Sequence, residues 1–257
     1  MLYERVGHLR AGRADSVRID ARGLYYRELN EMVRAEIAAG AREIHLDNVN
    51  GQYYIGSGLK ADVKIIIDGV PGNDLGAFMD GPTIVVLGNG QDNIGNTMNS
   101  GKIVVHGHAG DVLGYGMRGG KLFVREEVGY RVGIHMKGYQ AQVPTLVAGG
   151  SAGDFLGEYM AGGILVVLGL KGNPTVGDYL GTGMHGGVIY VRGDVKKGQC
   201  GKEVGMVKVK AEEEVVLKET LVEFCQEFAL KVEEVADGDF TRIVPVSSRP
   251  YGNLYAY

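Results

Sequence analysis

The chain has little of what would place it among disulfide-stabilised or membrane proteins. Cys200 and Cys225 are its only cysteines in 257 residues, so it has no disulfide framework and no CxxC metal or redox motif. No apolar run approaches the roughly 18 residues that cross a bilayer, and the N-terminus lacks the charged-then-apolar pattern of a signal peptide. We therefore expect a cytoplasmic protein with no membrane partner.

The chain also lacks an excess of positive charge. Its net charge is −4 with both signs mixed, which argues against nucleic-acid binding, because proteins with that task normally present a basic face. The spacing of its serine, histidine, aspartate and cysteine residues yields no nucleophilic triad or dyad. We therefore expect a scaffold with no catalytic, cofactor-binding or metal-binding residues of its own.

What the sequence does contain is a glycine-punctuated repeat of about 19 residues, each unit ending in a short apolar strand. The second and fourth residues of every strand are aliphatic, and positions two residues apart share one face of a strand. The first and fifth positions are mostly polar, so we expect one face in the core and the other mostly in solvent. The expected strand starts, separated by 21, 19, 19, 19, 24, 19 and 24 residues, are Glu43, Lys64, Thr83, Lys102, Lys121, Thr145, Ile164 and Val188.

A unit of this length is too short for a strand and a crossover helix, but it suits one coil of a parallel β-helix. We predict an all-β fold, a single right-handed parallel β-helix of about eight coils over residues 43–210, its hand following the rule for parallel crossovers. Glycine, with 43 residues, is expected at the corners, where the chain needs positive φ. The expected corner column is Gly56, Gly76, Gly95, Gly114, Gly133, Gly157 and Gly177.

Two segments outside the repeat have helical periodicity and are expected to cap the coil near its two ends, where strand edges would otherwise be exposed. In residues 1–42, Leu29, Val33 and Ile37 recur at helical spacing, and this helix should cover the first coil. In residues 211–257 a second apolar stripe should cover the last coil; its members are Leu217, Leu221, Phe224, Phe228 and Val232.

The tail after Asp237 is apolar and aromatic and has no coil of its own. Its side-chain types are enriched at protein interfaces. We expect it to be extended and docked, either on its own rod or on another chain, and the candidate partner contacts in it are Arg249, Pro250, Tyr251 and Tyr255.

Three motifs invite a chemical interpretation. Residues 114–119 and 181–186 match GxGxxG but precede strands, whereas a dinucleotide-binding motif follows a strand and opens a helix. His106 and His108 could place two imidazoles together, but no third ligand accompanies them. A set of aspartates is expected to bond local turn backbone, although a carboxylate groove like that of β-helix polysaccharide enzymes is an alternative. These are Asp74, Asp92, Asp111, Asp154 and Asp178.

Residues 110–120 (GDVLGYGMRGG) and 153–163 (GDFLGEYMAGG) together carry a family resemblance. The pattern resembles the GXGXG domain, the third domain of the glutamate synthase large (alpha) subunit, and residues 27–30 and 48–58 resemble its start. The resemblance covers roughly residues 15–210. Related domains occur in one subunit of formylmethanofuran dehydrogenase and in N-methylglutamate synthase subunits.

In that family the β-helix lies between an amidotransferase domain, which releases ammonia from glutamine, and an FMN and iron–sulfur domain, which converts 2-oxoglutarate to glutamate. This chain has Leu2 after Met1 instead of a nucleophilic cysteine, and it has no cysteine cluster for iron–sulfur ligation. The resemblance therefore implies a noncatalytic coupling subunit. Its partners would be a glutamine amidotransferase subunit and an FMN/iron–sulfur glutamate synthase subunit, which carry the cofactors.

Two other functions stay open. One is the role of the related β-helical subunit in a formylmethanofuran dehydrogenase-type oxidoreductase, which the related domains suggest. The other is a β-helix enzyme acting on an acidic polysaccharide, for which the aspartates are the motive.

Overall fold

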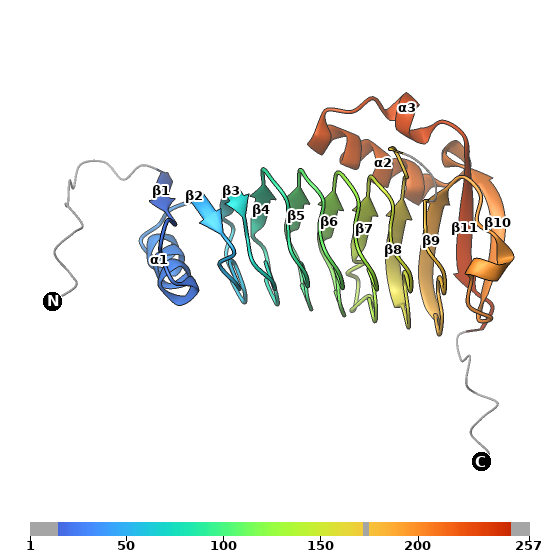
Figure 1. Cartoon of the computed structure of the whole chain (residues 1–257), viewed down its shortest axis with the longest axis horizontal. Helices are drawn as coiled ribbons and strands as arrows, with labels where there is room; N and C mark the ends of the chain where they lie inside the picture. Colours follow the sequence, from blue (N-terminus) through green and yellow to red (C-terminus); the bar gives the residue numbers. More distant parts are fainter. Residues whose placement is uncertain (1–14, 172–174, 248–257) are drawn as a thin grey trace, which may run out of the picture.

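The computed structural model describes residues 15–171 and 175–247, and its centre is a row of stacked strands (Figure 1). Eleven strands form one sheet in the order β1-β2-β3-β4-β5-β6-β7-β8-β9-β11-β10. Strands β1 to β8 each pair in parallel with the next strand along the chain. One strand per repeat, returning through a tight corner, makes the fold a parallel β-helix, as the repeat predicts.

The parallel strands keep the predicted register along the whole ladder. Lys64 lies opposite Thr83, and Ile164 lies between Thr145 and Val188, so all eight predicted strand starts face one another. The aliphatic residues at the second and fourth positions are fully buried in one continuous interior. The strands are β1 (Ser16–Asp20), β2 (Glu43–Asn50), β3 (Lys64–Val70), β4 (Thr83–Val86), β5 (Lys102–Val105), β6 (Lys121–Val124), β7 (Thr145–Ala148), β8 (Ala161–Val167) and β9 (Gly186–Arg192).

The number of coils is slightly smaller than predicted. A coil runs from one strand to the next, so the eight strands β2 to β9 enclose seven complete coils. Strand β1 extends the parallel ladder at the N-terminal end and was not predicted. It pairs with β2 in the register Ser16 to Glu43, and a helix occupies the chain between them.

Helix α1 (Tyr26–Ala38) lies at the N-terminal end of the coil, as predicted (Figure 1). Leu29 and Val33 are buried in the same interior as the strand residue Ile44. The Glu28 carboxylate accepts a hydrogen bond from the Tyr25 backbone N–H at 3.0 Å and so satisfies a donor at the start of the helix.

Helix α2 (Val215–Phe228) was predicted to cover the last coil, and that position is wrong. It lies along the outer face of the later strands (Figure 1). Its apolar stripe packs on one residue from each of the strands β5 to β9, the third after the predicted strand start, and the Phe224 and Phe123 rings meet edge to face at 5.9 Å. These third residues are buried with α2 in a second core and are Val104, Phe123, Val147, Val166 and Tyr190.

The outer face is therefore not mostly solvent where α2 covers it. The prediction weighed the polar first and fifth positions and missed the apolar third position. Two lysines at the first position also belong to this interface: Lys102 Nζ lies 2.6 Å from a Glu227 oxygen and 2.8 Å from a Glu223 oxygen, and Lys121 pairs with Glu223 as well.

The C-terminal end of the coil is closed by an antiparallel pair of strands. β11 (Asp239–Pro245) pairs antiparallel with β9 and with β10 (Val204–Lys210). Ile243 is buried in the coil interior, and Val204 packs against it. The remaining short elements are η1 (Lys197–Gln199), η2 (Ala211–Glu213) and α3 (Val232–Ala236).

Six of the seven expected corner glycines, Gly177 being the exception, have φ between +64° and +74°. The seventh corner is Gly181, with φ of +64°. The corner glycine usually lies 12 residues after the strand start, as Gly76 does after Lys64. In the last unit, between Ile164 and Val188, the extra residues precede the corner and shift it to Gly181.

A corner glycine is required for two reasons, which Gly76 illustrates. Its φ is +64°, and an added Cβ would lie 2.6 Å from Cδ1 of Ile103 and 2.9 Å from Sδ of Met79. The corner glycine therefore lies directly against Ile103 of strand β5 and against the interior residue Met79, so that no side chain fits there.

We expect Gly76→Ala to lower the free energy of unfolding by about 1–3 kcal/mol through the φ cost and the overpacking. Urea denaturation followed by circular dichroism measures it. Gly198→Ala is the control, since a Cβ there meets no atom within 4 Å. An equal effect of the two substitutions would contradict this account of the corners.

The ion pairs under α2 predict how stability depends on pH. Burial by itself raises the pKa of Glu223, but the hydrogen bonds from Lys102 and Lys121 outweigh it and hold that pKa below the ordinary 4.5. A carboxylate with a lowered folded pKa adds stability above its unfolded pKa and loses it as the pH falls through the folded value.

We therefore expect Glu223→Gln to lower the urea midpoint at pH 7, and the difference from wild type to vanish in acid below the lowered pKa. Glu219→Gln on the same helix is the matched control, since Glu219 is exposed and forms no ion pair within the described ranges. A Glu223→Gln deficit that stays constant from pH 7 to pH 3 would show that the charge is not its cause.

Candidate functional site

The corner of each coil has an unusual backbone, with positive φ at three alternate residues. In the corner that follows β3 these are Asp74, Gly76 and Phe78, with φ of +61°, +64° and +58°. The residues between them face inward, so the three positive-φ residues lie on the outside of the corner. We call the positions before and after the corner glycine the leading and trailing columns.

This alternation lets each corner bond both neighbouring coils. The N–H groups of Asp74 and Phe78 donate to Asp92 and Asn96 carbonyls of the next coil, whereas that of Gly76 donates to the Ile55 carbonyl of the preceding coil. The backbone groups are thereby satisfied without a conventional sheet. The hydrogen bonds hold even bulky residues in a conformation that costs about 1–2 kcal/mol each.

Exposed aromatic side chains collect in these two columns and beside them. Phe78 is 53% exposed and Tyr179 is 56% exposed. The prediction missed this surface, although a signal was present: an aromatic or histidine recurs two residues before or after the corner glycines. We call the surface the aromatic edge; its exposed members are Tyr53, Tyr54, Phe78, Tyr115, Tyr130, His135, Tyr159 and Tyr179, and the half-buried Phe155 lies among them.

Many rings of the aromatic edge touch from coil to coil. Tyr115 meets His135 edge-on at 5.8 Å, and His135 stacks on Tyr159 at 5.3 Å. Phe155 stacks on Tyr179 at 4.7 Å. The Arg131 guanidinium lies 4.6 Å from the Phe155 ring and also pairs with the mostly buried Glu158, so the row is held in place.

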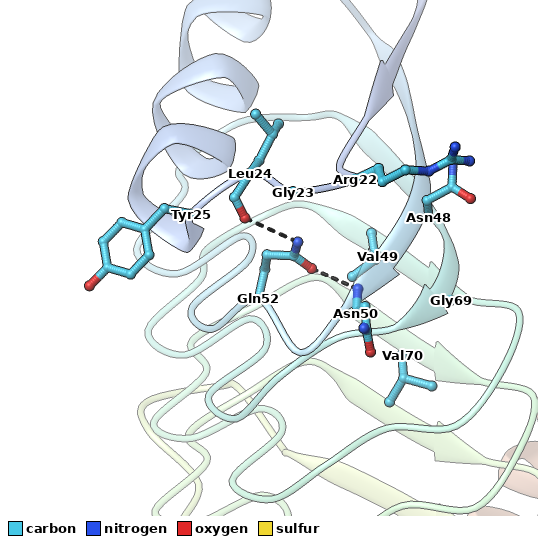
Figure 2. Close-up of a pocket in the computed structure, with 10 residues that line it drawn as sticks. All are labelled: Arg22, Gly23, Leu24, Tyr25, Asn48, Val49, Asn50, Gln52, Gly69 and Val70. Carbon is cyan, nitrogen blue, oxygen red and sulfur yellow. Dashed lines mark hydrogen bonds between the residues drawn. The ribbon is translucent and has the colours of Figure 1, made fainter.

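At the N-terminal end, the ring of Tyr26 lies against those of Tyr25, Tyr53 and Tyr54 and extends the aromatic edge. Beside them is a pocket of about 720 Å³. Figure 2 shows the buried Gln52 at its floor, with its amide donating to the Leu24 carbonyl and accepting from the Asn50 N–H. Arg22 is the charged residue among the described residues of the lining. The pocket can hold a small polar molecule, and the Tyr25 phenol and the Arg22 guanidinium are the titratable groups among its described lining residues.

Four of the five predicted aspartates bond the following coil instead of lining a groove, Asp74 through the Asn96 side chain; Asp178 is exposed. Asp92, Asp111 and Asp154 each accept a hydrogen bond of 2.8 Å from a backbone N–H of the following coil. Their carboxylates lie against glycines of that coil: a Cβ at Gly177 would be 2.2 Å from the Asp154 oxygen. The expected backbone bonding is therefore right in kind, but it links coils and not local turns. It leaves these carboxylates poorly placed for catalysis.

The remaining motif residues are scattered. His106 packs edge-on against Phe228 of α2 at 5.2 Å, and burial lowers its pKa, while His108 is exposed. Cys225 lies on the buried face of α2, and this burial raises the pKa of its thiol to about 11. Both GxGxxG segments form corners that lead into strands β6 and β9.

Within the described ranges no group of three or more histidine, cysteine, aspartate or glutamate side chains could hold a metal ion. None of the helices in that part of the chain has the length and apolarity to cross a bilayer. The expected partner contacts Arg249, Pro250, Tyr251 and Tyr255 lie outside the described residues.

Comparisons with known proteins agree with the family resemblance. A sequence profile of the GXGXG motif matches residues 30–246. The uncharacterized protein MJ1350 of Methanocaldococcus jannaschii is 47% identical over 252 residues, which cover 94% of this chain and 97% of the relative.

The fold also recurs in a solved structure. A chain of the formyltransferase/hydrolase complex FhcABCD from Methylorubrum extorquens, crystallised with methylofuran, superposes with a TM-score of 0.61. The match covers 92% of this chain and 98% of that chain at 18% identity. At this level of identity the similarity concerns the fold.

The role of the aspartates can be tested at Asp111. Asp111→Ala should lower the free energy of unfolding by about 1 kcal/mol, because the Tyr130 N–H loses its acceptor, whereas Asp111→Asn keeps an oxygen there and should cost less. Urea denaturation of both variants measures this. Asp178→Ala, at an exposed turn aspartate, is the control. Equal stability of Asp111→Ala and wild type would contradict the linking role.

Proposed function

The chain belongs to the GXGXG motif family, and from this we propose that it is a noncatalytic structural and coupling subunit of a multi-subunit enzyme. The observation that carries the proposal is the long exposed aromatic edge on a stacked coil whose described residues hold no metal cluster and whose aspartates are engaged in linking coils. Such a chain offers an extended surface to partner chains.

The coil suits a coupling role because it is stiff along its axis. Each coil is bonded to the next through its strand and through its corner. Nine parallel strands at about 4.8 Å spacing extend over roughly 38 Å. A rod of this kind can fix the distance between two catalytic chains, so that an intermediate passes from one to the other without escaping.

The enzyme we propose is glutamate synthase. The partners would be a glutamine amidotransferase subunit and an FMN/iron–sulfur glutamate synthase subunit, and the intermediate would be ammonia on its way to 2-oxoglutarate. The support is the resemblance of residues 110–120 and 153–163 to the glutamate synthase GXGXG domain. FMN and the iron–sulfur clusters would be bound by the partner chains.

A second candidate is the role of the related β-helical subunit in a formylmethanofuran dehydrogenase-type oxidoreductase. The observation that favours it is the fold shared, over nearly the whole length of both chains, with a chain of the formyltransferase/hydrolase complex. Its partners would then be formyl-transferring and hydrolytic chains.

Purification of the tagged chain from its source organism, with mass spectrometry and an absorption spectrum of its companions, separates the two. The glutamate synthase proposal expects amidotransferase-type and flavin/iron–sulfur chains. It further expects that adding this chain to the two purified catalytic chains increases glutamate formation from glutamine and 2-oxoglutarate. Full coupling without this chain, or glutamate formation by this chain alone, would refute it; formyl-transferring companions would favour the second candidate.

A further inference from the structure

The described chain ends beside the aromatic edge. Strand β11 pairs antiparallel with β9, so it runs back toward the corner that precedes β9. The Val246 N–H then donates to the Glu203 carbonyl at 2.8 Å, and the Glu203 carboxylate accepts from the Gly183 N–H of that corner at 3.2 Å. The same corner carries Tyr179 in its leading column, so the chain leaves the described part at the C-terminal end of the aromatic edge.

The rings nearest to this exit form a block across four successive corners. Within it, rings stack at 5.3 Å and 4.7 Å with their planes 10° apart, or meet edge-on at 5.8 Å. The next corner toward the N-terminus interrupts the row, since its outer positions hold Asn93 and Thr97. We call this part of the aromatic edge the C-terminal block; its members are Tyr115, His135, Phe155, Tyr159 and Tyr179.

Large side chains are strained at these positions. Phe155, Tyr159 and Tyr179 have φ between +52° and +62°, a conformation that glycine and asparagine adopt with less strain. Such residues fill the outer positions of other corners, as Asn93 and Gly183 do. Tyr179 is 56% exposed, so burial by the described residues does not offset its strain. A segment that packs on the rings would offset it, and rings already held by their neighbours lose little entropy in such a contact.

The ten residues that follow Ser247 in the sequence suit this surface. They include three tyrosines, a leucine and a proline, and their one charged side chain is that of Arg249. At about 3.3 Å per residue they can extend over about 33 Å, whereas the three steps between the four corners, at about 4.8 Å each, span roughly 14 Å. Tyr251 and Tyr255 are therefore both within reach of the C-terminal block.

The charges of the last two corners complement this tail. Residues 153–163 and 177–187, which form them, contain no lysine or arginine but two aspartates and one glutamate. The glutamate is already in an ion pair. Asp178 is exposed and forms no ion pair with another residue of the described ranges, and the exposed Lys202 adds one positive charge in the segment before β10. Asp178 is therefore available to the guanidinium of Arg249.

We infer that residues 248–257 of this chain pack along the C-terminal block, with their tyrosines on its rings and the Arg249 guanidinium beside the Asp178 carboxylate. The chain's own tail is favoured over that of a second copy, because a segment attached at the end of its binding surface has an effective concentration on the order of millimolar. This contact is intramolecular and does not depend on the proposed function. The N-terminal part of the aromatic edge, from Tyr53 to Phe78, stays open to partner chains.

Hydroxyl-radical labelling of the full chain, well below millimolar concentration, measures this cover. Tyr251→Ser together with Tyr255→Ser should raise the labelling of Tyr179 by about twofold or more, because a tail bound most of the time shields that ring. Tyr25→Ser, at an exposed tyrosine near the opposite end of the rod, is the matched control and should leave the labelling of Tyr179 as in wild type. Met32 on α1 is the exposed internal reference.

Charge is tested by exchange. Asp178→Arg and Arg249→Asp should each raise the labelling of Tyr159 and Tyr179, by less than the tyrosine substitutions do, because an exposed ion pair is weak. The two substitutions combined restore an opposite pair and should return the labelling toward the wild-type value. A general loss of structure would not be rescued by a second substitution, so the rescue separates a specific contact from misfolding.

Repeating the labelling over a range of protein concentrations, with sedimentation of the same samples, identifies which tail is bound. Protection of Tyr179 that does not change with concentration in a monomeric chain upholds the inference. Protection that appears only as dimers form would overturn it in favour of the tail of a second copy. Equal labelling of the free wild-type chain and the tyrosine variant would also overturn it, and protection confined to the native assembly would then assign the block to a partner chain. Both of these results would leave the coupling function standing.

Discussion

Every coil of this protein must lie on the one before it in unbroken register, and the rest of the structure follows from that constraint. Parallel strands supply one contact between coils, and the corner supplies the other through N–H groups that point alternately forward and back. That alternation demands positive φ at three residues per corner. Glycine is obligatory at the middle position, where the next strands press against it, and optional at the outer two.

The same constraint decides where the chain can vary. The two units of 24 residues keep both the strand and the corner in line by placing their extra residues elsewhere in the coil. In the first of them the insertion follows the corner, and in the second it precedes it, which is why the corner falls on Gly181. Freedom at the outer positions of the corner lets aromatic residues gather there at an energetic cost, and the exposed strand positions let lysines reach the glutamates of α2.

These features give the rod two long sides with different tasks. One side is closed by the chain itself, since α2 buries the third strand residues from Val104 to Tyr190. The side formed by the corners has no such cover among the described residues and carries the stacked rings. The proposed coupling role would use both a rod with continuous coil-to-coil bonding and a surface that remains available.

The sequence by itself determined the coil, the strand register and the buried columns, because a repeat of fixed length places equivalent residues opposite one another before any distant contact is known. The capping position of α1 followed from its helical stripe and its neighbourhood in the chain. What only the tertiary structure decided depends on residues far apart in sequence: Lys102 meets Glu227 across 125 positions, β11 turns back to join β9, and Asp111 bonds the coil above it. Helical periodicity shows that α2 has an apolar stripe, but it does not show which face of the coil that stripe packs against. The row of exposed rings likewise forms only when the coils stack, because residues of different coils become neighbours only in the fold.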